Sequence, residues 1–134
     1  MTTYVDSSAL LKRYVAEADS DVADAVLAAD ATLVTARHTV VEVRRSLARL
    51  LGGDDVTRAR AAFVADLGAV AIIELDADTC GTAAAIAESS GVRTLDALHL
   101  AAAQRVAEPG MRFLTFDTRQ AQAARALGLE VVPA

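Results

Sequence analysis

Short segments of β-branched and aromatic residues alternate with longer segments of helical spacing along almost the whole chain. The first type predicts strands at residues 2–5, 32–35, 70–75, 112–116 and 130–132. The second predicts a first helix that reaches residue 15, and further helices at residues 19–29, 38–51, 54–67, 76–88, 94–106 and 117–127. Strands that alternate with helices form a mostly parallel sheet with helices on both faces. With 134 residues and no linker or repeat, we expect a single α/β domain over residues 1–134.

The charge and the cysteine content narrow the class of protein. A net charge of −5 argues against a globally basic nucleic-acid-binding protein, but a nuclease whose site holds metal must itself be acidic. The single cysteine, Cys80, excludes an internal disulfide and a cysteine zinc cluster, and we expect it to be a buried free thiol. No apolar run approaches the roughly 18 residues that span a membrane. Charges at Asp6 and Lys12 are unlike a signal peptide, so we expect a soluble, cytoplasmic protein.

Acidic residues occur where the predicted strands end and the following helices begin. In a parallel sheet, strand ends and the first turns of the returning helices lie at one edge. Asp6 ends the first strand, and Asp117 directly follows the fourth. Glu42 and Asp96 lie early in predicted helices. Asp76 and Asp78 reach the same edge after the third strand. Geometry therefore nominates six acids for this edge: Asp6, Glu42, Asp76, Asp78, Asp96 and Asp117.

Carboxylates gathered at one edge repel, so one of them titrates upward or a cation holds them together. Oxygen ligands without a matching histidine or cysteine set favour Mg²⁺ or Mn²⁺. Metal-assisted hydrolysis of a phosphodiester fits such a site best. Structural roles compete with this interpretation. Asp6 is an equally good helix N-cap, Asp54 or Asp55 can cap the helix at 54–67, and Glu42 can pair with Arg45 on a solvated helix face.

Four short motifs occur in order along the chain: Asp6-Ser-Ser, Val40-Val-Glu-Val43, Thr94-Leu-Asp-Ala-Leu-His99 and Thr115-Phe-Asp117. Together they resemble the PIN domain over essentially the whole chain. Their order and spacing, and the chain length, are similar to those of the VapC-like toxins of bacterial toxin–antitoxin pairs.

The resemblance implies a parallel sheet of about five strands and a metal-dependent endoribonuclease toxin, a phosphodiester hydrolase that uses Mg²⁺ or Mn²⁺. It selects Asp6, Glu42, Asp96 and Asp117 as catalytic residues and metal ligands, and it leaves Asp76 and Asp78 as helix-cap candidates. Thr115, with Ser7 or Ser8, matches hydroxyl residues that hydrogen-bond the acids or bound water, and we expect Ser7 also to cap the first helix. The implied partners are an RNA substrate, a VapB-like antitoxin that blocks the site, and a second copy of the chain.

Several basic residues have two interpretations. Arg44, Arg45 and Arg49 share the predicted helix of Glu42, and Arg37 comes just before it. They are candidates for RNA-phosphate contacts, although a solvated basic helix face accounts for each equally well. His99 follows Asp96 by one helical turn, where a metal-ligand or RNA contact is one interpretation, but we expect a packed or surface histidine.

Other functions remain as alternatives. A dehalogenase-type phosphatase would need an acid where Ser8 stands, and a receiver domain would need a late lysine, whereas Lys12 is the only lysine. A non-catalytic module that uses the PIN scaffold to bind RNA or protein is the main alternative to the nuclease. Binding of a divalent ion separates these two.

Overall fold

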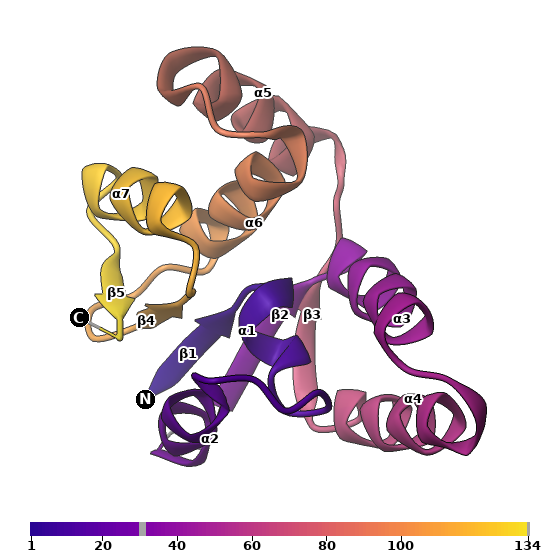
Figure 1. Ribbon diagram of the computed structural model, residues 1–134. Helices are drawn as coiled ribbons and strands as arrows, with labels where there is room; N and C mark the ends of the chain where they lie inside the picture. The colour runs from indigo at the N-terminus through magenta and orange to yellow at the C-terminus, as the bar shows by residue number, and fades with distance from the viewer. Residues whose placement is uncertain (30–31, 134) are drawn as a thin grey trace.

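Five parallel strands form one sheet in the computed structural model, which describes residues 1–29 and 32–133. The strand order is β3-β2-β1-β4-β5, so the first strand lies at the centre (Figure 1). The strands are β1 (Thr2–Val5), β2 (Thr32–Ala36), β3 (Val70–Ile73), β4 (Arg112–Leu114) and β5 (Glu130–Val132). The predicted parallel α/β fold is confirmed.

Seven helices are found in the described part of the chain: α1 (Ser7–Leu11), α2 (Ser20–Ala29), α3 (His38–Leu50), α4 (Gly53–Leu67), α5 (Ala77–Ser90), α6 (Thr94–Arg105) and α7 (Thr118–Ala126). Helices α5, α6 and α7 lie on one side of the sheet and α1 to α4 on the other (Figure 1). Successive side chains of β1 point to opposite faces of the sheet, so Tyr4 packs into one buried apolar cluster and Val5 into the other.

Two strands are shorter than predicted: the strands expected at 70–75 and 112–116 end at Ile73 and Leu114. Each ends where its neighbouring strand ends. β3 ends at Ile73 because its partner β2 ends at Ala36, which pairs with Ile73. β4 ends at Leu114, opposite Val5, the last residue of β1. The carboxyl ends of the central strands are thus aligned, and the chain leaves the sheet there at Asp6, at Arg37 and at Thr115.

Three local predictions were wrong. Helix α1 ends at Leu11 rather than near residue 15, and turns follow it. Gly52 is the N-cap of α4, so neither Asp54 nor Asp55 caps that helix; both lie in its first turn, where the helix dipole favours them. Cys80 is exposed rather than buried. The buried residues of α5 recur at Thr79, Ala83 and Ile86, and Cys80 falls outside this stripe.

Candidate active site

Asp6 is buried at the end of the central strand, with 4% of its surface exposed. Its Oδ1 accepts hydrogen bonds from the backbone N–H of Ala9 and the hydroxyl of Ser8, each at 2.9 Å. The first bond makes Asp6 the N-cap of α1. Its Oδ2 accepts a hydrogen bond from Thr115. The Asp6 side chain thus caps α1 and also lies at the candidate site. The expectation that Ser7 caps this helix was wrong, because Asp6 is the N-cap.

Burial raises the pKa of the Asp6 carboxyl above its ordinary value, although the nearby His99 and the hydrogen bond from Thr115 partly offset this effect. A carboxylate that burial disfavours in its charged form gains from any cation placed beside it. Asp6 therefore has the electrostatic setting of a metal ligand.

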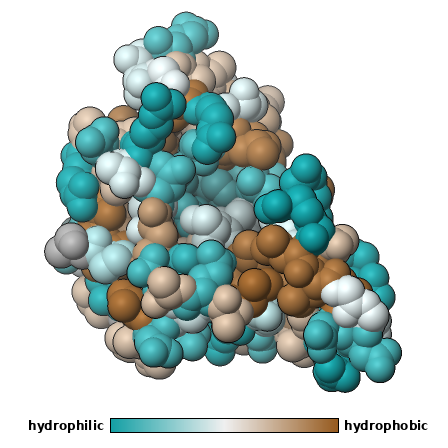
Figure 2. Space-filling view, in the orientation of Figure 1, coloured by the Kyte–Doolittle hydropathy of each residue, from teal (hydrophilic) through white to brown (hydrophobic). Residues whose placement is uncertain are grey.

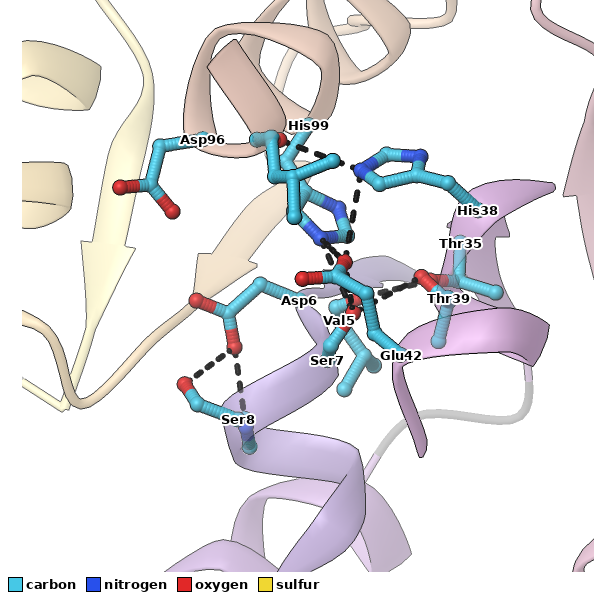
Figure 3. Close-up of polar contacts among 12 residues, drawn as sticks. Val5, Asp6, Ser7, Ser8, Thr35, His38, Thr39, Glu42, Asp96 and His99 are labelled. Carbon is cyan, nitrogen blue, oxygen red and sulfur yellow. Dashed lines mark hydrogen bonds and ion pairs between the residues drawn. The ribbon is translucent and has the colours of Figure 1, made fainter. Parts of the chain in front are cut away.

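Glu42 projects from α3 toward α1 and α6 (Figure 3). Its Oε1 accepts a hydrogen bond from the Ser7 hydroxyl at 2.6 Å and lies 3.0 Å from Nε2 of His99. Burial alone would raise the pKa of Glu42, but the bonds from His99 and Ser7 hold it below its ordinary value. Within the described ranges its polar partners come from other elements or from His38, and not from Arg45 as the alternative predicted.

Asp96 and Asp117 face one another across Arg93. The Arg93 guanidinium lies 3.6 Å from Asp96 Oδ2 and 3.8 Å from Asp117 Oδ2. Burial and then the charge of Asp117 raise the pKa of Asp96, while Arg93 lowers it. Asp117 also caps α7 by accepting the backbone N–H of Gln120 at 2.9 Å. Two of the predicted acids therefore lie close enough to repel, with the exposed Arg93 guanidinium between them.

The candidate acids lie close enough to influence one another and their neighbours electrostatically. Asp6 contributes to the pKa shift of Asp96, and both Asp6 and Glu42 act on the buried hydroxyl of Tyr4, whose pKa burial raises well above its usual value. Thr115 joins two acids directly, because its Oγ1 donates to Asp6 and accepts the backbone N–H of Asp117 at 3.1 Å. The structure thus places Asp6, Glu42, Asp96 and Asp117 around the carboxyl end of β1.

Two histidines lie beside Glu42. His99 is 2% exposed, as a packed histidine would be, but its Nδ1 also lies 2.8 Å from the Tyr4 hydroxyl. His38, which the sequence reasoning missed, is 8% exposed, and its Nε2 lies 3.5 Å from Glu42 Oε1. Burial and the neighbouring His99 lower the pKa of His38 to about 4. The sequence carried a signal for it, since His38 precedes Glu42 by one helical turn.

The acids at this edge carry the kind of donor atom that a divalent cation takes, although among the described residues only Glu42 and the two neighbouring histidines already have ligand atoms within 4.8 Å of one another. Asp6, Asp96 and Asp117 offer carboxylate oxygens, the ligands that Mg²⁺ and Mn²⁺ prefer. Burial raises the pKa of Asp6, and burial with the charges of Asp117 and Asp6 raises the pKa of Asp96, so an uncompensated charge is disfavoured on both. Glu42 turns toward the two histidines (Figure 3). Among the described residues, it forms with them a group whose ligand atoms lie within 4.8 Å of one another.

Asp76 and Asp78 lie apart from this arrangement of acids. Asp76 is the N-cap of α5, where it accepts the backbone N–H of Thr79 at 2.9 Å, and it pairs with Arg105 at 2.6 Å. Asp78 is exposed in the first turn of α5 and is not the cap. Asp76 therefore serves the helix-capping role that the resemblance left for it.

The four candidate RNA-binding arginines differ in their surroundings. Arg37 is paired with Glu74, with Nε 2.9 Å from Oε1. Arg44 and Arg45 line a groove of about 430 Å³ between α3 and α4, and Arg49 is exposed near the end of α3. Apolar residues gather over these two helices (Figure 2), where Val41 is 69% exposed.

The PIN domain family matches residues 3–126 of the chain. Ribonuclease VapC46 of Mycobacterium tuberculosis is 33% identical over 129 residues, which are 96% of this chain and 95% of the relative. The chain therefore belongs to the PIN-domain family, and within it to the VapC-like ribonucleases. The resemblance seen in the four sequence motifs is confirmed.

Solved structures agree on the fold. VapC20 of M. tuberculosis, described as a sarcin–ricin loop cleaving toxin, has a TM-score of 0.73 at 20% identity over 90% of this chain and 94% of its own. A chain of a toxin–antitoxin complex from Klebsiella pneumoniae has a TM-score of 0.68 at 17% identity, over 88% of each chain. Within the described residues, no helix is both long and apolar enough to cross a membrane.

Proposed function

We propose that this protein is a metal-dependent endoribonuclease that acts as a toxin, with Asp6, Glu42, Asp96 and Asp117 as its catalytic residues. The observation that carries the proposal is the convergence of these acids, from four separate segments, on the carboxyl end of the central strand. Membership in the VapC-like ribonucleases agrees with it. The single domain over residues 1–134 and a cytoplasmic location are part of the same proposal.

Each residue has a role that follows from its place. Asp6, Asp96 and Asp117 would hold Mg²⁺ or Mn²⁺. When bound, the ion would supply a Lewis acid for the phosphoryl oxygen and a water of lowered pKa. Glu42 would hold metal or orient the attacking water, whose attack on phosphorus would displace the 3′-hydroxyl and leave a 5′-phosphate. Ser7 and Thr115 keep the carboxylates in place through the hydrogen bonds at Glu42 and Asp6.

The proposed partners are an RNA substrate, a VapB-like antitoxin and a second copy of the chain. The groove between α3 and α4 is apolar at Val40, Val41 and Val56 and basic at its arginines. Such a surface suits a partner segment with an apolar face and acidic residues. One of the fold neighbours was solved as a toxin–antitoxin complex, which supports an antitoxin as that partner.

Purified protein incubated with total cellular RNA and Mg²⁺ or Mn²⁺ tests the function, with the cut ends mapped. We expect discrete cleavage sites with 5′-phosphates for the native protein, and no cleavage for Asp6→Asn. The matched control is Asp78→Asn, which changes an exposed acid away from the site and should cleave normally. Full activity of Asp6→Asn in metal-containing buffer would refute the assignment. Calorimetry that detects no divalent-ion binding would favour the non-catalytic module.

A further inference from the structure

His38, Glu42 and His99 form a compact group beside the four acids, and the nuclease mechanism gives the two histidines no task. Each offers one ligand atom, and these atoms lie within 4.8 Å of one another. The group joins two helices, since His38 and Glu42 lie one turn apart on α3 and His99 lies on α6. Figure 3 shows the three side chains directed toward one another.

The two separations from Glu42 are close to those of ligands around one small ion. Metal–ligand bonds of about 2.0–2.2 Å in a tetrahedral zinc site place neighbouring ligand atoms about 3.3–3.5 Å apart. Glu42 Oε1 lies 3.0 Å from Nε2 of His99 and 3.5 Å from Nε2 of His38. Glu42 Oε1 is therefore placed to share an ion with either imidazole nitrogen, and the two nitrogens lie within 4.8 Å of each other.

Hydrogen bonds around the group support this arrangement. A histidine that binds metal through one ring nitrogen usually gives its other N–H to a fixed acceptor. His99 has such a partner, because its Nδ1 lies 2.8 Å from the buried Tyr4 hydroxyl. The Ser7 hydroxyl lies next to both proposed ligand atoms, since it donates to Glu42 Oε1 at 2.6 Å and lies 3.0 Å from His99 Nε2.

His38 brings a second buried imidazole to the group. Its side chain is only 9% exposed, and its Nδ1 is buried with no hydrogen-bond partner in the described part of the chain. Its Nε2 faces the group, close to two oxygens, Glu42 Oε1 and the Leu95 carbonyl at 3.1 Å. Unlike His99, His38 has no fixed acceptor at its Nδ1 among the described residues, so its contribution to the group is the position of Nε2 between these two oxygens. A cation at Nε2 would be surrounded by electron-rich atoms.

We propose that His38, Glu42 and His99 form a binding site for Zn²⁺ or a similar transition-metal ion, separate from the oxygen site of Asp6, Asp96 and Asp117. Imidazole ligands select such ions over Mg²⁺. A zinc ion held here has three protein ligands and one open position. Glu42 belongs to both groups, so zinc removes it from the catalytic set and inhibits the nuclease. This inhibition rests on the proposed function, whereas the binding does not.

Co²⁺ bound to the unmodified, metal-free protein is the first test. Four-coordinate Co²⁺ with nitrogen ligands absorbs strongly in the visible range, while six-coordinate Co²⁺ with oxygen ligands absorbs weakly. We expect a strong band that one equivalent of Zn²⁺ removes and that a large excess of Mg²⁺ leaves in place. Absence of the band, or its loss on adding Mg²⁺, overturns the proposal. No variant is needed for this measurement.

Variants then assign the ligands by calorimetric titration with Zn²⁺ alone. His38→Gln should weaken Zn²⁺ binding at least about tenfold, because it removes a direct ligand. Asp96→Asn, which keeps all three proposed zinc ligands and removes only a nearby charge, should change the Zn²⁺ affinity less than about threefold. The opposite pattern places zinc on the acids and overturns the proposal. Circular dichroism establishes that each variant is folded.

Inhibition is measured relative to each protein's own rate with Mg²⁺. We expect micromolar or lower Zn²⁺ to inhibit RNA cleavage by the native protein, and the inhibitory concentration to rise at least about tenfold in His38→Gln. Equal inhibition of both proteins removes the regulatory part of the proposal. If no RNA is cleaved under any condition, the proposed function fails, and the Co²⁺ and Zn²⁺ binding results still decide the metal site.

Discussion

The hydroxyl of Thr115 donates a hydrogen bond to Oδ2 of Asp6, a residue 109 positions earlier in the chain. This bond connects the end of the central strand with the segment that follows β4. The hydroxyl oxygen of Thr115 also accepts a hydrogen bond from the backbone N–H of Asp117 at 3.1 Å. One buried hydroxyl thus fixes the relative positions of two candidate metal ligands.

Thr115→Val removes both bonds while keeping the shape of the side chain. We expect the free energy of unfolding at neutral pH to fall by about 1–3 kcal/mol, because a buried carboxylate oxygen loses its donor. Urea denaturation measures the change. Thr115→Ser is the control, since it keeps the hydroxyl and should cost less. Equal stability of Thr115→Val and the native protein would show that the Asp6–Thr115 bond contributes nothing.

Asp6 predicts an unusual pH dependence. Because burial raises its pKa in the folded state, the folded protein holds this proton more tightly than the unfolded chain does. Its contribution to stability is therefore present below the unfolded pKa of about 3.9 and is lost as pH rises through the raised folded value. Asp6→Asn removes this loss and keeps a good N-cap residue.

We therefore expect the stability of Asp6→Asn, relative to the native protein, to increase as the pH rises from 3 to 7 in metal-free buffer. Thermal unfolding at a series of pH values tests this. Added Mg²⁺ should stabilise the native protein more than the variant, because only the native site retains all of its ligands. A relative stability that decreases with pH would contradict the assigned cause of the pKa shift.

Arg93 competes with metal for Asp96 and Asp117. Its exposed guanidinium forms ion pairs with these two acids at 3.6 and 3.8 Å, and ion pairs at the surface typically contribute about 0.2–1 kcal/mol each. Arg93→Gln should therefore tighten Mg²⁺ or Mn²⁺ binding by up to about fivefold for each pair lost. Calorimetric titration measures the affinity, and Arg49→Gln, a change outside the site, is the control. Unchanged or weaker binding in Arg93→Gln would show that this arginine does not compete.

The sequence was sufficient for the sheet and for much of the site, for a physical reason. β-Branched segments and helical spacing are local signals, and the parallel topology then brings strand ends to one edge. Asp6 and Asp117 come directly after predicted strands, so placing them at this edge required only the strand assignments and the parallel topology. Capping did not compete with the site, because Asp6 and Asp117 both cap helices while facing the other acids.

Features that depend on contacts between distant segments could not be predicted from the sequence. The orientation of Glu42 toward His99 depends on how α3 meets α6. The pairing of Arg37 with Glu74 depends on the register of β2 and β3. The burial of a helix position such as Cys80 depends on which stripe of α5 faces α6, and periodicity was too weak in this alanine-rich helix to show it.

RNA binding should depend on the arginines of α3 in a way that salt reveals. For single-stranded RNA, each phosphate contact contributes about 0.7 to the slope of log affinity against log salt. In the inactive Asp6→Asn background, we expect Arg44→Gln to reduce this slope by about 0.7. Arg37→Gln is the control, because Arg37 is already paired with Glu74. Fluorescence anisotropy with a labelled RNA at several KCl concentrations measures the slopes, and equal slopes for Arg44→Gln and the Arg44 protein would exclude this contact.

Asp76 predicts a loss of stability in acid. Hydrogen bonds from Thr79 and the neighbouring Arg105 lower its pKa to about 2. A depressed folded-state pKa contributes stability above the unfolded value of about 3.9, and this stability is lost as pH falls toward 2. Asp76→Ala should therefore lower the melting temperature at neutral pH and reduce its decline between pH 4 and pH 2. Asp78→Ala, in the same first turn of α5 but not the cap, should do neither. Equal effects of the two substitutions would mean that the helix dipole, rather than the cap and the pair with Arg105, accounts for the role of Asp76.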